Sequence, residues 1–294
     1  MKALIYTLLT ALVLSMFAAC TTESKEPEPT AVDESLKSSK LPRKYGDMLR
    51  AIAQNPSDHK KNGLYINEVA SYYLETGATT KAIETLKRGI INHKPSNNTS
   101  SNILLLLDAL KSDPSKKQDY INLAQSLAIG YPSLNGLEKY TSDIPQGEPK
   151  MKDKIAEIQK NLTNTSTGRL DLPKVNEFVN AIEFFVIGNP TNESSPKYLK
   201  IAAEVVNSIK VYPRAIQFYD WILSSFPNSS EAPQALFMKG FTLDDGMNNK
   251  QAAKPVYEEF LKRYPNNDFA DDTKFLLENI NKSDEEIIKQ FDKK

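Results

Sequence analysis

The sequence predicts an all-α protein built from repeated helical hairpins. The chain has 294 residues, with only 11 glycines beside 17 prolines, a balance typical of helices punctuated by proline. No segment alternates apolar and polar residues for long enough to require a strand. The phrase from Ala215 to Pro227 recurs as Ala253 to Pro265, and internal repetition of this kind indicates an α-helical solenoid.

The charge balance and the cysteine count exclude several classes of function. The chain carries 37 basic and 37 acidic side chains, so it lacks the positive field by which proteins gather nucleic acid. Its single cysteine cannot close an intrachain disulfide, and with His59 and His93 it cannot complete a Cys/His zinc site. The common nucleotide-binding, metalloprotease and serine-hydrolase motifs are absent. We therefore expect no enzyme activity, no cofactor, no metal site and no nucleic-acid partner.

The first twenty residues have the pattern of a lipoprotein leader. Lys2 precedes an uncharged, mostly apolar stretch from Ala3 to Ala19, which matches the n-region and h-region of a signal peptide. The sequence Ala18-Ala19-Cys20 resembles the lipobox of bacterial lipoproteins, in which the cysteine sulfur is diacylated. The resemblance implies that residues 1–19 are a lipoprotein signal peptide and that Cys20 is lipidated. The alternative is an ordinary signal peptide, or a transmembrane anchor, with an incidental cysteine.

Residues 20–42 are predicted to be the acylated cysteine and a disordered tether. The segment is polar, charged and proline-containing, with too few apolar side chains to offset the entropy of ordering. Roughly 20 flexible residues reach about 25 Å, enough to hold a domain clear of the lipid headgroups. Glu23, Glu26 and Glu28 are either a surface-export signal or ordinary linker composition.

Helical periodicity continues through the rest of the chain. Two turn-rich breaks, 140–150 and 161–171, interrupt it. They divide the body into N-terminal helical repeats at 43–140, a linker with one helix at 141–172, and C-terminal repeats at 173–294. The helices expected from the apolar spacing are 43–54, 63–76, 79–93, 100–111, 116–130, 150–162, 173–187, 196–210, 213–225, 231–244, 251–263, 268–280 and 283–292.

The first clear repeat unit spans residues 63–95. It has small residues at its eighth and twentieth positions, Ala70 and Ala82, a tyrosine at its eleventh, Tyr73, and a proline at its end. Small side chains let two antiparallel helices approach closely, and the proline ends the second helix. This pattern resembles the tetratricopeptide repeat, which implies an α-α superhelix. The C-terminal copies carry the same pairs of small residues, Ala203 with Ala215 and Gly240 with Ala253.

The last copy differs from the others in two places. It contains a one-residue insertion within the segment Asp244-Asp-Gly-Met-Asn-Asn249. These acidic residues faintly resemble a calcium loop, but they lack the alternating ligands and closing glutamate of an EF-hand, so an interhelical turn is favoured. Pro255 is expected either to delay the start of its helix or to kink it.

The tetratricopeptide resemblance also implies where a partner binds. Such repeats bind on the concave face made by the first helix of each hairpin, at positions two, five, nine and twelve. We expect Phe237 and Phe241 to anchor a peptide, because aromatic side chains dominate many interfaces. The candidate residues are Asn67, Ser71, Lys197, Lys200, Glu204, Asn207, Gln234, Phe237, Phe241 and Asp244.

These features predict a membrane-anchored scaffold for protein–protein interaction in the bacterial cell envelope. The C-terminal units resemble those of the BamD family of lipoproteins and of the CpoB family of coordinators. The resemblance implies a role in outer-membrane assembly or cell-wall coordination. It also implies that the protein is lipid-anchored at the outer membrane, either periplasmic or surface-facing. The expected partners are envelope proteins or peptide segments, and the membrane through the lipid. The alternative is a glycan- or solute-binding lipoprotein working with an outer-membrane transporter. Such sites usually cluster exposed Trp and Tyr, whereas the one tryptophan, Trp221, falls on a second helix.

Overall fold

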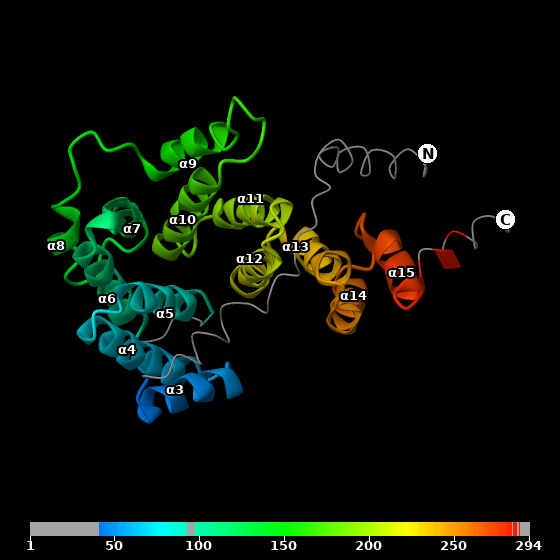
Figure 1. Ribbon diagram of the computed structural model, residues 1–294, viewed down its shortest axis with the longest axis horizontal. Coiled ribbons are helices and arrows are strands. Elements are labelled where there is room, and N and C mark those ends of the chain that lie inside the picture. Colours follow the sequence, from blue (N-terminus) through cyan, green and yellow to red (C-terminus); the bar gives the residue numbers. More distant parts are fainter. Residues whose placement is uncertain (1–40, 93–97, 284, 287, 289–294) are drawn as a thin grey trace. The chain divides into compact units, whose positions relative to one another are not determined.

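The computed structural model describes residues 41–92, 98–283, 285, 286 and 288 (Figure 1). Most of the predicted leader and tether, and His93, therefore lie outside the described residues. The chain divides into two units, Met1–Gly46 and Asp47–Lys294. In the part that the structure describes, the chain is all-α, as expected, and its β structure is limited to one isolated bridge between Thr163 and Leu170. None of the described helices is both long and apolar enough to span a membrane.

The N-terminal helices form packed hairpins. After α3 (Arg43–Gln54) come α4 (His59–Glu75), α5 (Thr79–Asn92), α6 (Thr99–Ser112), a 3-10 turn (Pro114–Lys116) and α7 (Lys117–Gly130). The small residues Ala70 and Ala82 are fully buried where α4 packs on α5. Helix α4 begins four residues earlier than expected, because the Asp58 carboxylate caps it by accepting from the Lys61 amide at 3.2 Å.

The segment after α7 contains one helix that the sequence did not predict. This short helix, α8 (Glu138–Thr141), is held by the Tyr140 hydroxyl, which donates to Asp108 Oδ1 of α6 at 2.9 Å. It is followed by α9 (Met151–Lys160) and α10 (Leu172–Gly188). Helix α10 packs directly on α7. The two backbones approach so closely at Gly130 that an added Cβ would overlap the carbonyl oxygen of Gly188. The helical array is thus continuous across the intervening residues.

The C-terminal hairpins follow in order along the chain. They are α11 (Ser195–Ser208) with α12 (Tyr212–Ser225), α13 (Ala232–Phe241) with α14 (Lys250–Arg263), and a last helix, α15 (Ala270–Asn279). The predicted one-residue insertion falls on a π-helical turn, Thr242–Gly246, where the Met247 amide bonds the Thr242 carbonyl at 2.9 Å. Of the expected helix at 283–292, residues 285, 286 and 288 are described, and they are helical.

Of the two alternatives for Pro255, a delayed helix start or a kink, the structure excludes the delayed start. Helix α14 begins at Lys250, five residues before the proline. The Asn249 side chain caps this start by accepting from the Ala252 amide at 3.1 Å. A cap of this kind supplies the hydrogen bonding that a helix start needs, so the helix forms ahead of Pro255.

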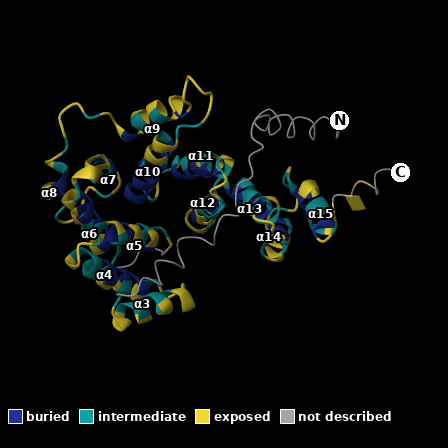
Figure 2. Cartoon of the chain, viewed as in Figure 1, coloured by how far each residue is buried: buried dark blue, intermediate teal, exposed yellow. Residues whose placement is uncertain are grey.

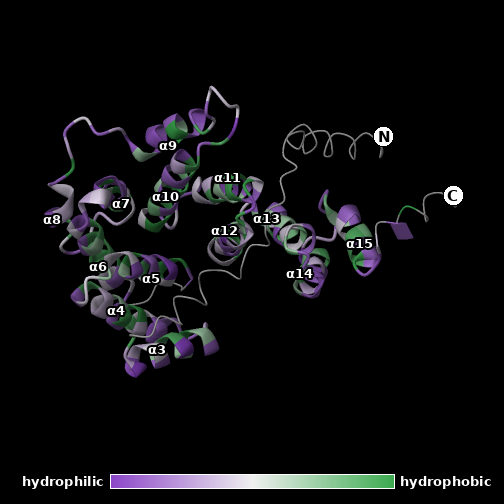
Figure 3. Ribbon diagram, viewed as in Figure 1, coloured by the Kyte–Doolittle hydropathy of each residue, from purple (hydrophilic) through white to green (hydrophobic). Residues whose placement is uncertain are grey.

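Glu183 joins three hairpins in the interior of the second unit. It lies on α10, the most extensively buried helix in Figure 2 and a predominantly apolar one in Figure 3. Its carboxylate, 8% exposed, pairs with Lys87 of α5 and with Arg214 of α12, whose Nη2 is 3.2 Å from Oε1. Asn180 Oδ1 accepts from the same two cations at 3.4 and 3.3 Å. Although burial opposes ionisation, the two positive charges hold the pKa of Glu183 below its usual range.

Candidate partner-binding surfaces

The polar candidate residues of α11 and α13 form one connected surface. Lys200 Nζ lies 3.3 Å from Glu204 Oε1 on its own helix and 3.2 Å from Gln234 Oε1 on α13. Beyond the end of α13, the buried Thr242 of the π-helical turn donates through its hydroxyl to Asn207 Oδ1 of α11 at 3.4 Å. Lys197 is exposed one turn before Lys200. The structure therefore brings the first helices of two successive repeats together, with charged groups accessible along the contact.

The candidates on α4 are placed differently. Asn67 donates through Nδ2 to Asn102 Oδ1 of α6 at 2.9 Å, and the buried Asn102 donates in turn to the Gly63 carbonyl at 3.1 Å. The Asn67 side chain therefore helps to hold α4 against α6. Ser71, one turn later on α4, is half-buried. Leu64, which is 49% exposed, was missed in the sequence, although it occupies position two of the same repeat unit. Leu64 adds apolar surface beside this polar pair.

The two phenylalanines expected to anchor a partner have different surroundings. Phe237 is buried, with its ring stacked against Phe269 at a centroid distance of 4.5 Å and against Phe241 at 6.3 Å. The Phe260 ring approaches it edge-on at 6.0 Å. Phe241 is half-buried at the end of this column. Phe237 therefore belongs to the packing between repeats, and Phe241 is the ring that retains surface for a partner.

Asp244 lies in the π-helical turn and not on a regular first helix. Its Oδ2 accepts from the Tyr257 hydroxyl of α14 at 3.3 Å. Burial raises the pKa of Asp244, and burial together with the neighbouring Asp244 charge raises the pKa of Tyr257. The described residues contain no group of three or more His, Cys, Asp and Glu side chains arranged to hold a metal.

Two other residues considered from the sequence, His59 and Trp221, have structural roles. His59 is the first residue of α4. Trp221 of α12 is 6% exposed and belongs to the main hydrophobic core. Because its ring is covered, Trp221 offers no exposed face on which a sugar could stack.

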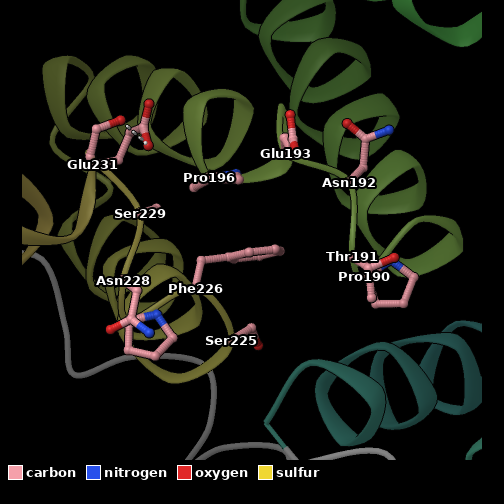
Figure 4. Close-up of a pocket in the computed structure, with 12 residues that line it drawn as sticks. Pro190, Thr191, Asn192, Glu193, Pro196, Ser225, Phe226, Asn228, Ser229 and Glu231 are labelled. Carbon is pink, nitrogen blue, oxygen red and sulfur yellow. Dashed lines mark hydrogen bonds between the residues drawn. The ribbon is translucent and has the colours of Figure 1, made fainter.

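An open groove lies between two inter-helix loops (Figure 4). One wall is residues 190–196, which form the loop after α10 and the first residues of α11; the other is residues 225–231, which form the end of α12 and the loop after it. The volume of the groove is about 460 Å³. The ring of Phe226 projects into the space between the loops in Figure 4. Pro190 and Pro227 add apolar surface, and the buried Pro196 lines the groove beneath them. The groove was not predicted. The proline that ends each second helix is the sequence signal that points to these loops.

Comparison with known families identifies one repeat. A tetratricopeptide-repeat family model matches residues 234–267, which contain most of α13, the π-helical turn and α14. The predicted tetratricopeptide repeat is thereby confirmed for this hairpin. Comparison with curated proteins finds no match. A tetratricopeptide repeat is generally a non-catalytic scaffold for protein partners, so the hairpin suggests protein–protein interaction.

Proposed function

We propose that this protein is a lipid-anchored tetratricopeptide scaffold that holds a protein partner at the bacterial cell envelope. The observation that carries the proposal is the connected surface over α11 and α13, in which Lys200 bridges Glu204 and Gln234. Helix α13 belongs to the hairpin that matches the repeat family, and α11 lies directly beside that hairpin. Charged and polar groups held in fixed positions favour specific recognition of a polar protein segment.

The half-buried ring of Phe241 supports the same surface as a binding site. It ends the stack that continues through Phe237 and Phe269, so its position is set by packing before a partner arrives. Preorganised aromatic side chains contribute most to interfaces, because little conformational freedom is lost on binding. We infer that Phe241 provides the apolar contact and that Lys197, Lys200 and Glu204 provide the polar contacts.

Site-specific photocrosslinking in cells tests this surface. A photoreactive amino acid replaces the exposed Lys197 of α11, and the matched control places it at Lys262, exposed on the second helix α14. We expect position 197, and not position 262, to yield discrete adducts that mass spectrometry identifies as envelope proteins. Equal adducts from both positions, or none from position 197, would refute the binding surface.

The lipid anchor is tested separately. The sequence Ala18-Ala19-Cys20 supports acylation of Cys20, and several acyl chains on one residue suffice for stable membrane attachment. Cys20→Ala should shift the protein from the membrane fraction to the soluble envelope fraction. Retention of Cys20→Ala in the membrane fraction contradicts the lipoprotein assignment and leaves the crosslinking result unaffected.

A further inference from the structure

We propose that the groove between loops 190–196 and 225–231 binds a basic side chain, preferably arginine, of a protein partner. The groove is formed mainly by the loops between repeats, at the N-terminal ends of α11 and α13. It is therefore a different site from the face along the sides of these two helices. Its occupant follows from the charge and shape of its lining. The proposal does not depend on the lipid anchor.

The lining of the groove is acidic and partly apolar. Its twelve residues include two carboxylates, Glu193 and Glu231, and no lysine or arginine, although the whole chain has as many basic as acidic residues. Among the described residues, neither carboxylate has an ion-pair partner, and Glu231 accepts only from the neighbouring Ser230 hydroxyl, at 3.0 Å. Both charges are thus available to a cation that enters the groove.

In the next repeat, the position that corresponds to Glu231 is filled by an aromatic ring. The loops 227–232 and 265–270 align at a spacing of 38 residues, which pairs Glu231 with Phe269. The Phe269 ring turns into the core and stacks on Phe237. At the groove, a carboxylate therefore replaces a core side chain.

On the other wall, an inward-facing amide replaces an aromatic residue. Asn189 and Phe226 end successive second helices with nearly the same backbone conformation, φ −137° and ψ 63° against φ −130° and ψ 50°. Asn189 is buried and donates to the Ser126 and Phe185 carbonyls at 3.1 and 3.0 Å. The first loop therefore contributes no ring, and Phe226, which also packs against the main core, borders the open groove.

An arginine side chain fits these features better than a neutral one. Its methylene groups can lie against Pro190 and Pro196, while its planar guanidinium stacks on the Phe226 ring. The positive guanidinium is also attracted by the two carboxylates at the rim of the groove, Glu193 and Glu231. A lysine side chain also carries the positive charge that the carboxylates attract, but its ammonium group cannot stack in a plane on the Phe226 ring. It should therefore bind more weakly.

The test uses the full-length protein and two capped tripeptides, acetyl-Gly-Arg-Gly-amide and acetyl-Gly-Gln-Gly-amide. Backbone amide chemical shifts are followed by NMR during titration. We expect the arginine peptide to shift the amides of 191–194 and 228–231 with a millimolar dissociation constant, and the glutamine peptide to leave them unchanged. The isosteric double variant Glu193→Gln/Glu231→Gln should weaken binding about tenfold, since each ion pair at a solvent-exposed site contributes roughly twofold to fivefold.

Glu75→Gln is the matched control, because Glu75 is exposed at the end of α4, on another repeat. It should leave the affinity for the arginine peptide unchanged. Three results would overturn the proposal: no shifts in the two loops, equal shifts with the glutamine peptide, or undiminished binding by the double variant. Failure of the crosslinking test at Lys197 would leave these outcomes standing, so the two proposals are tested independently.

Discussion

Replacing Glu183 by glutamine tests whether the ion network on α10 holds the N-terminal and C-terminal hairpins together. The substitution preserves side-chain length but removes the charge that pairs with Lys87 and Arg214. Removing one partner of a buried ion pair costs about 3–5 kcal/mol, because the remaining charge is left uncompensated. Lys87 and Arg214 are 16% and 27% exposed, so water partly solvates them. We therefore expect a loss near 3 kcal/mol, at the lower end of that range.

Urea unfolding of the full-length protein, followed by circular dichroism, measures this loss. For a slope of about 3 kcal/mol per molar urea, the midpoint should fall by about 1 M. The matched control is Glu177→Gln, an exposed carboxylate on the same helix, which should change stability by less than about 0.5 kcal/mol. If Glu183→Gln costs no more than Glu177→Gln, the network does not hold the hairpins together.

The pH dependence of the same comparison provides a second check. Burial raises the pKa of Glu183, and the two cations lower it. The combined effect of Lys87 and Arg214 is the larger one, so the pKa lies below its usual value. Because the folded-state pKa lies below the unfolded value, the stabilisation is complete above the unfolded pKa and is lost as the pH falls through the folded pKa. The stability difference between wild type and Glu183→Gln should therefore be constant near neutral pH and shrink in acid. A difference that grows in acid contradicts the assignment.

Two further pairs of substitutions test the packing of the repeats by urea unfolding. Gly130→Ala should destabilise the protein by about 3 kcal/mol, because the added Cβ meets the Gly188 backbone, which no rotamer change can move. Gly77→Ala, with φ 75° and no atom near the added Cβ, should cost only about 1 kcal/mol, and equal losses would refute the close packing of α7 on α10. Phe237→Ala should cost about 3–5 kcal/mol as a buried ring. Phe241→Ala should cost about 1 kcal/mol while reducing the crosslinks from position 197, and the reverse order of stability losses would contradict the assignment of Phe237 to the core.

The sequence predicted the local packing of the hairpins well, because that information is periodic and short-range. Ala70, Ala82, Ala203, Ala215 and Ala253 were assigned to helix contacts from their spacing alone, and each is fully buried. A small side chain at a crossing point is required by helix geometry whatever the rest of the chain does. The same logic located the one-residue insertion, although its conformation as a π-helical turn depends on how the neighbouring helices pack.

The candidate binding face could be predicted only in part. The repeat pattern identified the helices α4, α11 and α13, but the pattern does not tell which outward position is covered by a neighbour. Phe237 and Phe241 are one turn apart in the sequence and look equivalent there. Phe269, contributed by a loop nearly thirty residues later, covers one of them. The groove at Phe226 also depends on two loops from different repeats.

The sequence by itself determined the helical class, the repeat spacing and the small residues at the helix crossings, because each depends on contacts within one or two neighbouring helices. Only the tertiary structure decided that α7 packs on α10, that Glu183 meets Lys87 and Arg214, and that two loops border an open groove. Glu183 lies within a predominantly apolar helix, and the sequence pattern does not indicate its partners. Contacts between distant segments follow no period, so they appear only when the hairpins are placed against one another.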